Sequence, residues 1–399
     1  MSYLKQLCLL VMATLVIGCS DDDGMNQPPT TGDETTYDLA ELSDSGVSGT
    51  AKIEELDDGT SKLTLDLTGT PSDGMHPSHI HANTAAESGD IIISLNEVDG
   101  STGMSETIIS EDAAGNMVTY QDLLEIDGYI NVHLSPDELT TVVAQGDIGQ
   151  NDLTGESKTY TLGEKDVDGI SGSVMFEERM NGEAQATIML DGTPDGEMHP
   201  AHIHMNTALE EGSIIYSFDA VNGNSGMSRS NVAELEDGTS FGYSDVLSVD
   251  GYVNVHLGPG DDLATIVAQG DIGENELTGE SITYDLNEKD VPGISGTVMF
   301  EERMNGEALA TISLTGTPAD GMHPAHIHEN SASESGPILV SFNPVVGDTG
   351  MSKTNITENN MNFGYDDILT VDGYVNVHLG PGDDLTTIVA QGNIGANAN

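Results

Sequence analysis

Apolar and polar residues alternate one by one along several short segments of the chain. In one segment Leu63, Leu65 and Leu67 are separated by single polar residues, and Ile188 and Leu190 repeat the pattern further along. A period of two is expected of a β-strand with one buried face. No window shows the 3.6-residue period of an amphipathic helix. The hydrophobic pattern therefore predicts an all-β protein.

Turn residues separate the predicted strands. Asn181-Gly182 lies between apolar segments and favours a type I′ hairpin, and Asn305-Gly306 and Asp58-Gly59 follow similar segments. Further strands are predicted over 91–95, 129–134 and 141–145. About seven short strands in roughly 120 residues, separated by Gly and Asp turns, are typical of an antiparallel, Greek-key-like β-sandwich.

The chain contains three copies of one unit. The segment 75–81, which reads Met-His-Pro-Ser-His-Ile-His, recurs with small changes at 198–204 and 322–328. A period of about 124 residues is too long for a solenoid repeat and long enough for a complete domain. We therefore predict three tandem sandwich domains, over residues 36–156, 157–280 and 281–399.

The first residues resemble the export signal of a bacterial lipoprotein. Lys5 precedes an apolar run over 7–17, which is too short to span a bilayer, and Gly18-Cys19 closes it. This pattern predicts a signal peptide over 1–18 and a lipid on Cys19 after cleavage. An ordinary secretory signal with an incidental cysteine is the alternative. Because Cys8 would leave with the signal peptide, no disulfide framework is expected.

The segment 19–35 is polar and contains Pro28 and Pro29. Such a segment buries too little apolar surface to order itself, so we predict a flexible acidic tether. Ser20 followed by three Asp resembles the surface-export signal of lipoproteins in some Gram-negative bacteria. The expected location is the outer membrane, on the cell surface, with the lipid on Cys19 as the contact with the membrane.

The charge balance excludes one class of partner. The chain has 68 acidic and 10 basic residues, a formal net charge of -58. Such a surface repels nucleic acid and anionic lipid headgroups, whereas it gathers cations. We expect no nucleic-acid partner and a monomer, and the sequence indicates no particular protein or glycan partner.

All 12 histidines fall in four matching positions of the three copies. On a strand, His79 and His81 point to the same face, and His133 ends a second strand. If the two strands are neighbours, three imidazoles converge and His76 lies on an adjacent turn. The candidate ligands are His76, His79, His81 and His133; His199, His202, His204 and His256; and His323, His326, His328 and His378. The sequence leaves open whether His76, His199 and His323 join the clusters or face solvent.

Clusters of neutral imidazoles suit Cu²⁺ and Zn²⁺, so one copper or zinc ion per repeat is the first hypothesis. Its rival is a structural or adhesive array whose histidines are hydrogen-bonded and free of metal, since buried histidines often have that role. The Gly/Asp segments 258–262 and 380–384 could hold Ca²⁺. Tight turns are the commoner use of such residues, and we favour the turn.

The histidine segments and the strands around them resemble the CHRD (chordin-type) domain. His79-Ile80-His81, Ser88-Gly89-Asp90-Ile91, 129–133 and Ala144-Gln145-Gly146 follow the order of that family's motifs. No Gly directly follows His-Ile-His, and the family's closing Glu-Ile-Arg is absent. The resemblance covers nearly all of 36–396 and implies an extracellular β-sandwich module without a defined activity.

A fainter similarity is to copper-zinc superoxide dismutases, which also carry a His-x-His strand and a distant histidine. No histidine lies between His81 and His133, so that family's bridging and zinc ligands have no counterparts. The net charge would also steer superoxide away. We therefore predict a non-catalytic protein with no catalytic residues, and rank a dismutase-like enzyme as the third hypothesis.

Overall fold

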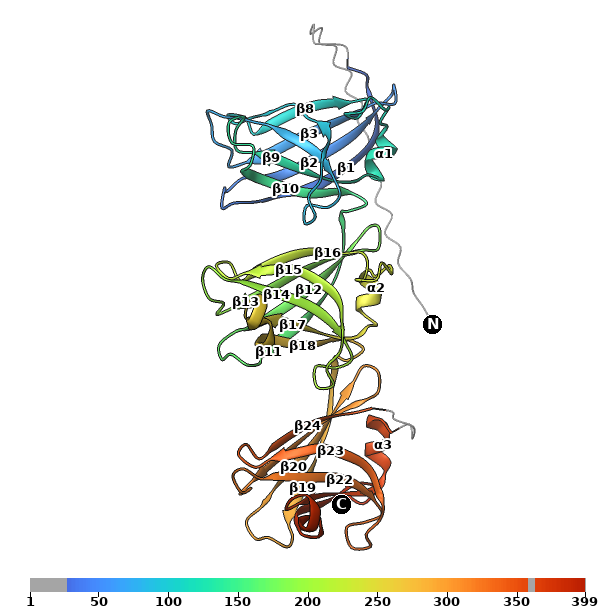
Figure 1. Cartoon of the computed structure of the whole chain (residues 1–399). Coiled ribbons are helices and arrows are strands. Elements are labelled where there is room, and N and C mark those ends of the chain that lie inside the picture. Colours follow the sequence, from blue (N-terminus) through green and yellow to red (C-terminus); the bar gives the residue numbers. More distant parts are fainter. Residues whose placement is uncertain (1–26, 358–362, 399) are drawn as a thin grey trace, which may run out of the picture.

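The computed structural model describes residues 27–357 and 363–398. The predicted signal peptide over 1–18 and the lipidation site Cys19 lie outside the described residues and stay predictions. Strands account for 55% of the structure and helices for 7%, which confirms the all-β class. Figure 1 shows three compact sheet structures following one another along the chain, coloured blue to teal, green to yellow, and orange to red.

The second and third repeats are closed eight-stranded barrels with the same strand order. In the second, the order is β11-β12-β13-β16-β15-β14-β17-β18, and all paired neighbours are antiparallel. Its strands are β11 (Leu153–Glu164), β12 (Ser171–Arg179), β13 (Ala184–Asp191), β14 (Met198–Met205), β15 (Ile214–Asn222), β16 (Met227–Val232), β17 (Asp250–His256) and β18 (Ile266–Gly273). Those of the third are β19 (Leu277–Glu288), β20 (Ser295–Arg303), β21 (Ala308–Thr315), β22 (Met322–Glu329), β23 (Ile338–Val346), β24 (Met351–Ile356), β25 (Asp372–His378) and β26 (Ile388–Gly395).

Closure of the barrels differs from the predicted pair of separate sheets. The long first strand β11 pairs with β12 over most of its length and then with β18, where Gly163 lies opposite Gln269. One strand therefore belongs to both faces, and the hydrogen-bonded ladder runs all the way round. Alternation of apolar residues shows which face of a strand is buried, but it does not show whether the outermost strands meet.

The first repeat has the same strand order in a ladder that stays open. Its strands are β1 (Thr30–Glu41), β2 (Ser48–Leu56), β3 (Ser61–Thr68), β4 (Met75–His76), β5 (Ser78–Ala82), β6 (Ile91–Ser94), β7 (Val98–Asp99), β8 (Met104–Ile109), β9 (Asp127–His133) and β10 (Val142–Gly149). The order is β4-β7-β8-β3-β2-β1-β10-β9-β5-β6, so two strands of the other repeats are each split here. One break falls at Pro77, which has no N–H to donate. The second repeat has a register shift at the matching place, between His199 and Ala201.

The strands begin earlier than the predicted domain boundaries. β1 starts at Thr30, within the segment 19–35 predicted as a tether, while β11 and β19 start at Leu153 and Leu277. The first residues of β1 are exposed and polar, and backbone pairing with β2 holds them in place. Because these residues bury no side chains, the hydrophobic pattern gives no sign of the strand.

Each repeat has its own hydrophobic core. In the first core, Leu63, Leu65 and Leu67 are buried as the alternation predicts. In the second and third cores, Phe176 of β12 and Phe300 of β20 occupy equivalent positions and are buried. Each core is also covered by one short helix that the sequence did not predict, because four to six residues are too few to show a helical period. The helices are α1 (Tyr120–Leu124), α2 (Tyr243–Val246) and α3 (Tyr365–Thr370), and two 3₁₀ turns are η1 (Gly260–Ala264) and η2 (Gly382–Thr386).

Across residues 27–357 and 363–398, the helices are all too short or too polar to cross a membrane.

Candidate metal centre

Two neighbouring strands bring three histidines together in every repeat. In the first, β5 carries His79 and His81, and His133 ends β9, which pairs with β5. Between the two histidines of β5, the side chain of Ile80 is fully buried in the core. The strand pleat therefore places both imidazoles on the face opposite to the core, where His133 joins them. This is the convergence that the sequence predicts.

The three triads have nearly the same geometry. In each triad the candidate ligand nitrogens all lie within 4.8 Å of one another. In the first repeat the ring centroids of His79 and His133 are 5.3 Å apart, and those of His81 and His133 are 6.4 Å apart. The matching distances are 5.0 and 6.4 Å in the second repeat and 5.2 and 6.4 Å in the third. Nitrogens bound to one ion at about 2.0 Å lie about 3.3 Å apart, so small ring rotations suffice to close the site.

The triads contain no carboxylate. Within the described part of the chain, every group of side chains that could hold a metal ion consists of histidines alone: His79, His81 and His133; His202, His204 and His256; and His326, His328 and His378. Three imidazoles favour Cu²⁺ or Zn²⁺ over Ca²⁺, which prefers oxygen ligands. The metal preference of each site is thus determined by three imidazole nitrogens, although the chain as a whole is very acidic.

Backbone carbonyls orient the second histidine of each triad. The Nδ1–H of His81 donates to the carbonyl oxygen of Gly89 at 2.9 Å, and His204 and His328 repeat the contact. Because a carbonyl only accepts, this bond fixes the tautomer and leaves Nε2 with its lone pair free to bind a metal. Nε2 of His81 is buried and has no hydrogen-bond partner. The ring of Tyr129 stacks on His81 at 5.0 Å and limits its rotation.

A turn orients the third histidine. Nδ1–H of His256 donates to the carbonyl oxygen of Leu263 at 2.7 Å, and Leu263 lies in the η1 turn. In the first and third repeats, burial lowers the pKa of His133 and His378, and the nearby carbonyls of Leu139 and Leu385 oppose that shift. Nδ1 of these two rings has no hydrogen-bond partner. The Gly/Asp segments 258–262 and 380–384 lead into the turns η1 and η2. In the second repeat, the turn places the carbonyl that directs Nε2 of His256 toward the triad.

The first histidine of each triad has a buried Nδ1 without a hydrogen-bond partner. This holds for His79, His202 and His326. An unpaired polar atom in a buried position costs free energy, and native proteins rarely leave one unexplained. In each triad the unpaired nitrogens lie beside two further imidazoles, so a metal ion would satisfy them together.

Burial favours the neutral, metal-binding form of two rings in each triad. Desolvation, followed by the nearby His256 and His204, lowers the pKa of His202 to about 4. The pKa of His326 is also lowered to about 4 for the same reasons. Desolvation likewise lowers the pKa of His79 and His133. These rings are uncharged at neutral pH and need not lose a proton before they coordinate an ion.

These shifts predict how the stability of the metal-free protein depends on pH. In the unfolded chain His202 and His326 take up protons near pH 6.5, whereas in the folded state they do so near pH 4. The stability that they contribute is complete above pH 6.5 and is lost as the pH falls toward 4. Urea unfolding of metal-free protein at pH 7 and pH 5.5 should show lower stability at pH 5.5. A His202→Asn, His326→Asn variant should show a smaller decrease, and an equal or larger decrease would contradict the assignment.

The fourth histidine of each repeat does not join the triad, which corrects the inclusion of His76, His199 and His323 among the candidate ligands. His76 is fully buried, and its Nδ1–H donates to the backbone carbonyl of His133 at 3.2 Å. Its Nε2 packs closely against Gly100: a Cβ atom on residue 100 would lie only 3.0 Å from that nitrogen. His199 and His323 make the same bond to His256 and His378. In each repeat, the fourth histidine thus holds the end of the strand that carries the third histidine of the triad.

Replacing His76 with leucine should separate this supporting role from ligation. The variant leaves the buried carbonyl of His133 without its partner, so we expect a loss of about 1–3 kcal/mol in stability. The number of metal ions bound per chain should not change. Thermal unfolding and metal analysis of the same sample measure both quantities, and loss of one ion from folded protein would show that His76 is a ligand after all.

The fold and the triads define an all-β protein with three equivalent nitrogen-donor sites. None of the family models, curated proteins or solved structures compared with this chain matches it. The resemblance to CHRD domains therefore rests on the sequence motifs alone, and the histidine triads are the main indication of function.

Proposed function

We propose that this protein is a non-catalytic lipoprotein of the cell envelope, in which each repeat binds one copper or zinc ion. The observation that carries the proposal is the repeated triad, formed three times with closely similar distances. Three imidazoles from two strands make a credible set of ligands, and solvent or a further group can complete the coordination.

The state of the ring nitrogens favours metal binding over the metal-free array. An unpaired nitrogen alone does not distinguish the two hypotheses, because the supporting ring of His76 also has a buried Nε2 without a partner. In the triads, however, the unpaired Nδ1 of His79 and Nε2 of His81 belong to rings whose candidate ligand atoms lie within 4.8 Å of one another, and the other two triads repeat this. The nitrogens that do have partners, such as Nδ1 of His81, are those that direct the free nitrogen toward the triad.

Three further features support the cellular setting and the class of domain. The proposed lipid on Cys19 would hold the protein at the outer membrane, facing outward. The acidic surface would raise the local concentration of cations. The connections β13–β14 and β16–β17 each cross two strands of the barrel, which supports the Greek-key arrangement expected of a CHRD-like module.

Metal analysis of purified protein, supplied with micromolar Cu²⁺ or Zn²⁺, tests the proposal. We expect three ions per chain, and two in a His79→Ala, His81→Ala, His133→Ala variant. An Asp261→Asn, Asp262→Asn variant is the control for binding by surface carboxylates and should keep three. Absence of bound metal from the folded protein would favour the structural array, and superoxide turnover by the loaded protein would favour the dismutase-like hypothesis.

A further inference from the structure

A buried arginine crosses the boundary between the first two repeats. Arg179, the last residue of β12, has a fully buried side chain and pairs with Asp147 of β10 at 2.8 Å. The same Nη1 donates to the backbone carbonyl of Asn151 in the connection between the repeats. A buried guanidinium is tolerated only where a charge and several acceptors surround it. Arg179 of the second repeat therefore contacts both a strand of the first repeat, at Asp147, and the connecting segment that follows it, at Asn151.

Other hydrogen bonds surround this arginine. Nε of Arg179 donates to the side chain of Asn231 at 2.8 Å, and the amide of Asn231 donates across the boundary to Glu87 at 3.2 Å. The backbone N–H groups of Met180 and Asn181 donate to the carbonyls of Asp152 and Gln150. The turn after β12 is thus bonded to the connecting segment through its backbone as well.

The second boundary repeats the first. Arg303 pairs with Asp271 at 2.8 Å, and its Nε donates to Asn355 at 2.7 Å. Asn355 in turn donates across the boundary to Glu210 at 3.2 Å. Two of the three arginines in the chain are used in this way. We call each of these contacts an arginine junction.

The first and third repeats each lack one of the two charged partners. Leu56 ends β2, as Arg179 ends β12, and is 1% exposed. In the third repeat, Asn393 takes the place of Asp147. It still accepts the backbone N–H of Ala332, as Asp147 accepts that of Ala85, but it carries no charge for an arginine. Leu56 can make neither the ion pair nor the hydrogen bonds of Arg179, whereas Asn393 keeps the bond to Ala332 and offers no charge.

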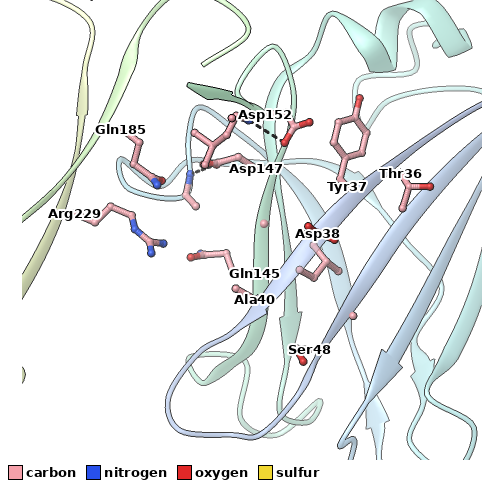
Figure 2. A pocket seen from close by; sticks show the side chains of 16 residues that line it. Thr36, Tyr37, Asp38, Ala40, Ser48, Gln145, Asp147, Asp152, Gln185 and Arg229 are labelled. Atoms are coloured by element: carbon pink, nitrogen blue, oxygen red, sulfur yellow. Dashed lines mark hydrogen bonds between the residues drawn. The ribbon is translucent and has the colours of Figure 1, made fainter. Parts of the chain in front are cut away.

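Polar contacts, and not a sealed apolar interface, hold the boundary. A hollow of about 660 Å³ lies beside the first junction. Figure 2 shows Gln185 and Arg229 on one side of it and Gln145 and Asp147 on the other. Because the repeats are also strongly acidic, they repel one another electrostatically. Arg179 offsets this repulsion as the buried cation that forms an ion pair across the contact.

We propose that Arg179 and Arg303 fix successive repeats in one head-to-tail orientation, so that the array is a rod with three metal sites at set positions. The partner that this surface fits is a neighbouring repeat with the matching Asp. Leu56 in the first repeat and Asn393 in the third each replace one of the two charged partners, so neither position can form the same junction.

Variants that copy Leu56 and Asn393 test the proposal in the full chain. Arg179→Leu with Arg303→Leu reproduces Leu56, and Asp147→Asn with Asp271→Asn reproduces Asn393, so both pairs use residues that the fold already accepts. We expect backbone amide hydrogens at 180–181 and 304–305 to exchange roughly tenfold faster or more in either variant, because each breaks a buried ion pair. Exchange within the strand cores should not change, and small-angle X-ray scattering should show a broader distribution of lengths.

The matched control is Lys165→Gln with Lys289→Gln. It removes the same number of positive charges at exposed positions just after β11 and β19, and it should leave exchange and scattering as in the original chain. If neither junction variant alters exchange at the junction or the scattering, the proposal is wrong. If the arginine variant unfolds, the Asn variant decides between these outcomes by itself.

Discussion

Replacing His81 with alanine is expected to lower the affinity of the first site for Cu²⁺ or Zn²⁺ by roughly 10³-fold, beyond the 10- to 100-fold typical of losing a partner outside the ligand shell. The ring loses both its coordinating Nε2 and the bond through which Gly89 orients it. Two imidazoles and solvent remain, which form a weak site. Titration followed by calorimetry or by a competing chelator would measure this change.

The other repeats serve as internal controls for this variant. The two sites containing His204 and His328 should keep the affinity of the original chain, so the titration should resolve two tight ions and one weak ion. The change His204→Ala should give the same result, because the two rings have the same partners and distances. Three equally tight ions in either variant would exclude these rings as ligands.

Metal should also stabilise the fold strongly. An ion that binds only the folded state adds about 4 kcal/mol at a free concentration of roughly 1,000 times Kd. Each site draws ligands from strands that are distant in sequence, such as β14 and β17, so the unfolded chain presents no comparable site. We expect the unfolding temperature to rise on addition of Cu²⁺ or Zn²⁺ and to return when a chelator removes the ion.

A chain in which all nine triad histidines are changed to alanine is the control for this stabilisation. Ca²⁺ measures the stabilisation that any divalent cation gives by screening the acidic surface. The unfolding temperature of the control chain should rise no more with Cu²⁺ or Zn²⁺ than with Ca²⁺. If the original chain and the control gain equal stability from Cu²⁺ or Zn²⁺, the ions act through the carboxylates, and the triads make no specific contribution.

Much of the site could be predicted from the sequence because strand geometry is simple. A spacing of two residues places His79 and His81 on one face, and the matching position of His133 in every copy suggested a neighbouring strand. The structure brings these rings together. His76 could not be separated from them, because whether a ring faces a metal or a backbone carbonyl depends on a turn whose geometry the sequence pattern does not fix.

Closure of the barrels and the arginine junctions were not predictable in the same way. Closure depends on where the long strand β11 leaves β12 and meets β18, a choice that leaves its apolar alternation unchanged. Arg179 looks like an ordinary surface charge at a hairpin, although it is almost completely buried. The available clue was that the matching position holds Leu56 in the first copy and arginine in the two copies that follow another copy.

X-ray absorption spectroscopy of protein loaded with three equivalents of Cu²⁺ or Zn²⁺ would identify the atoms that bind each ion. We expect about three imidazole nitrogens near 2.0 Å around each ion, with the multiple scattering that imidazole rings produce. A shell made of carboxylate and water oxygens would contradict this expectation, because the ions would then lie on the acidic surface and not in the triads.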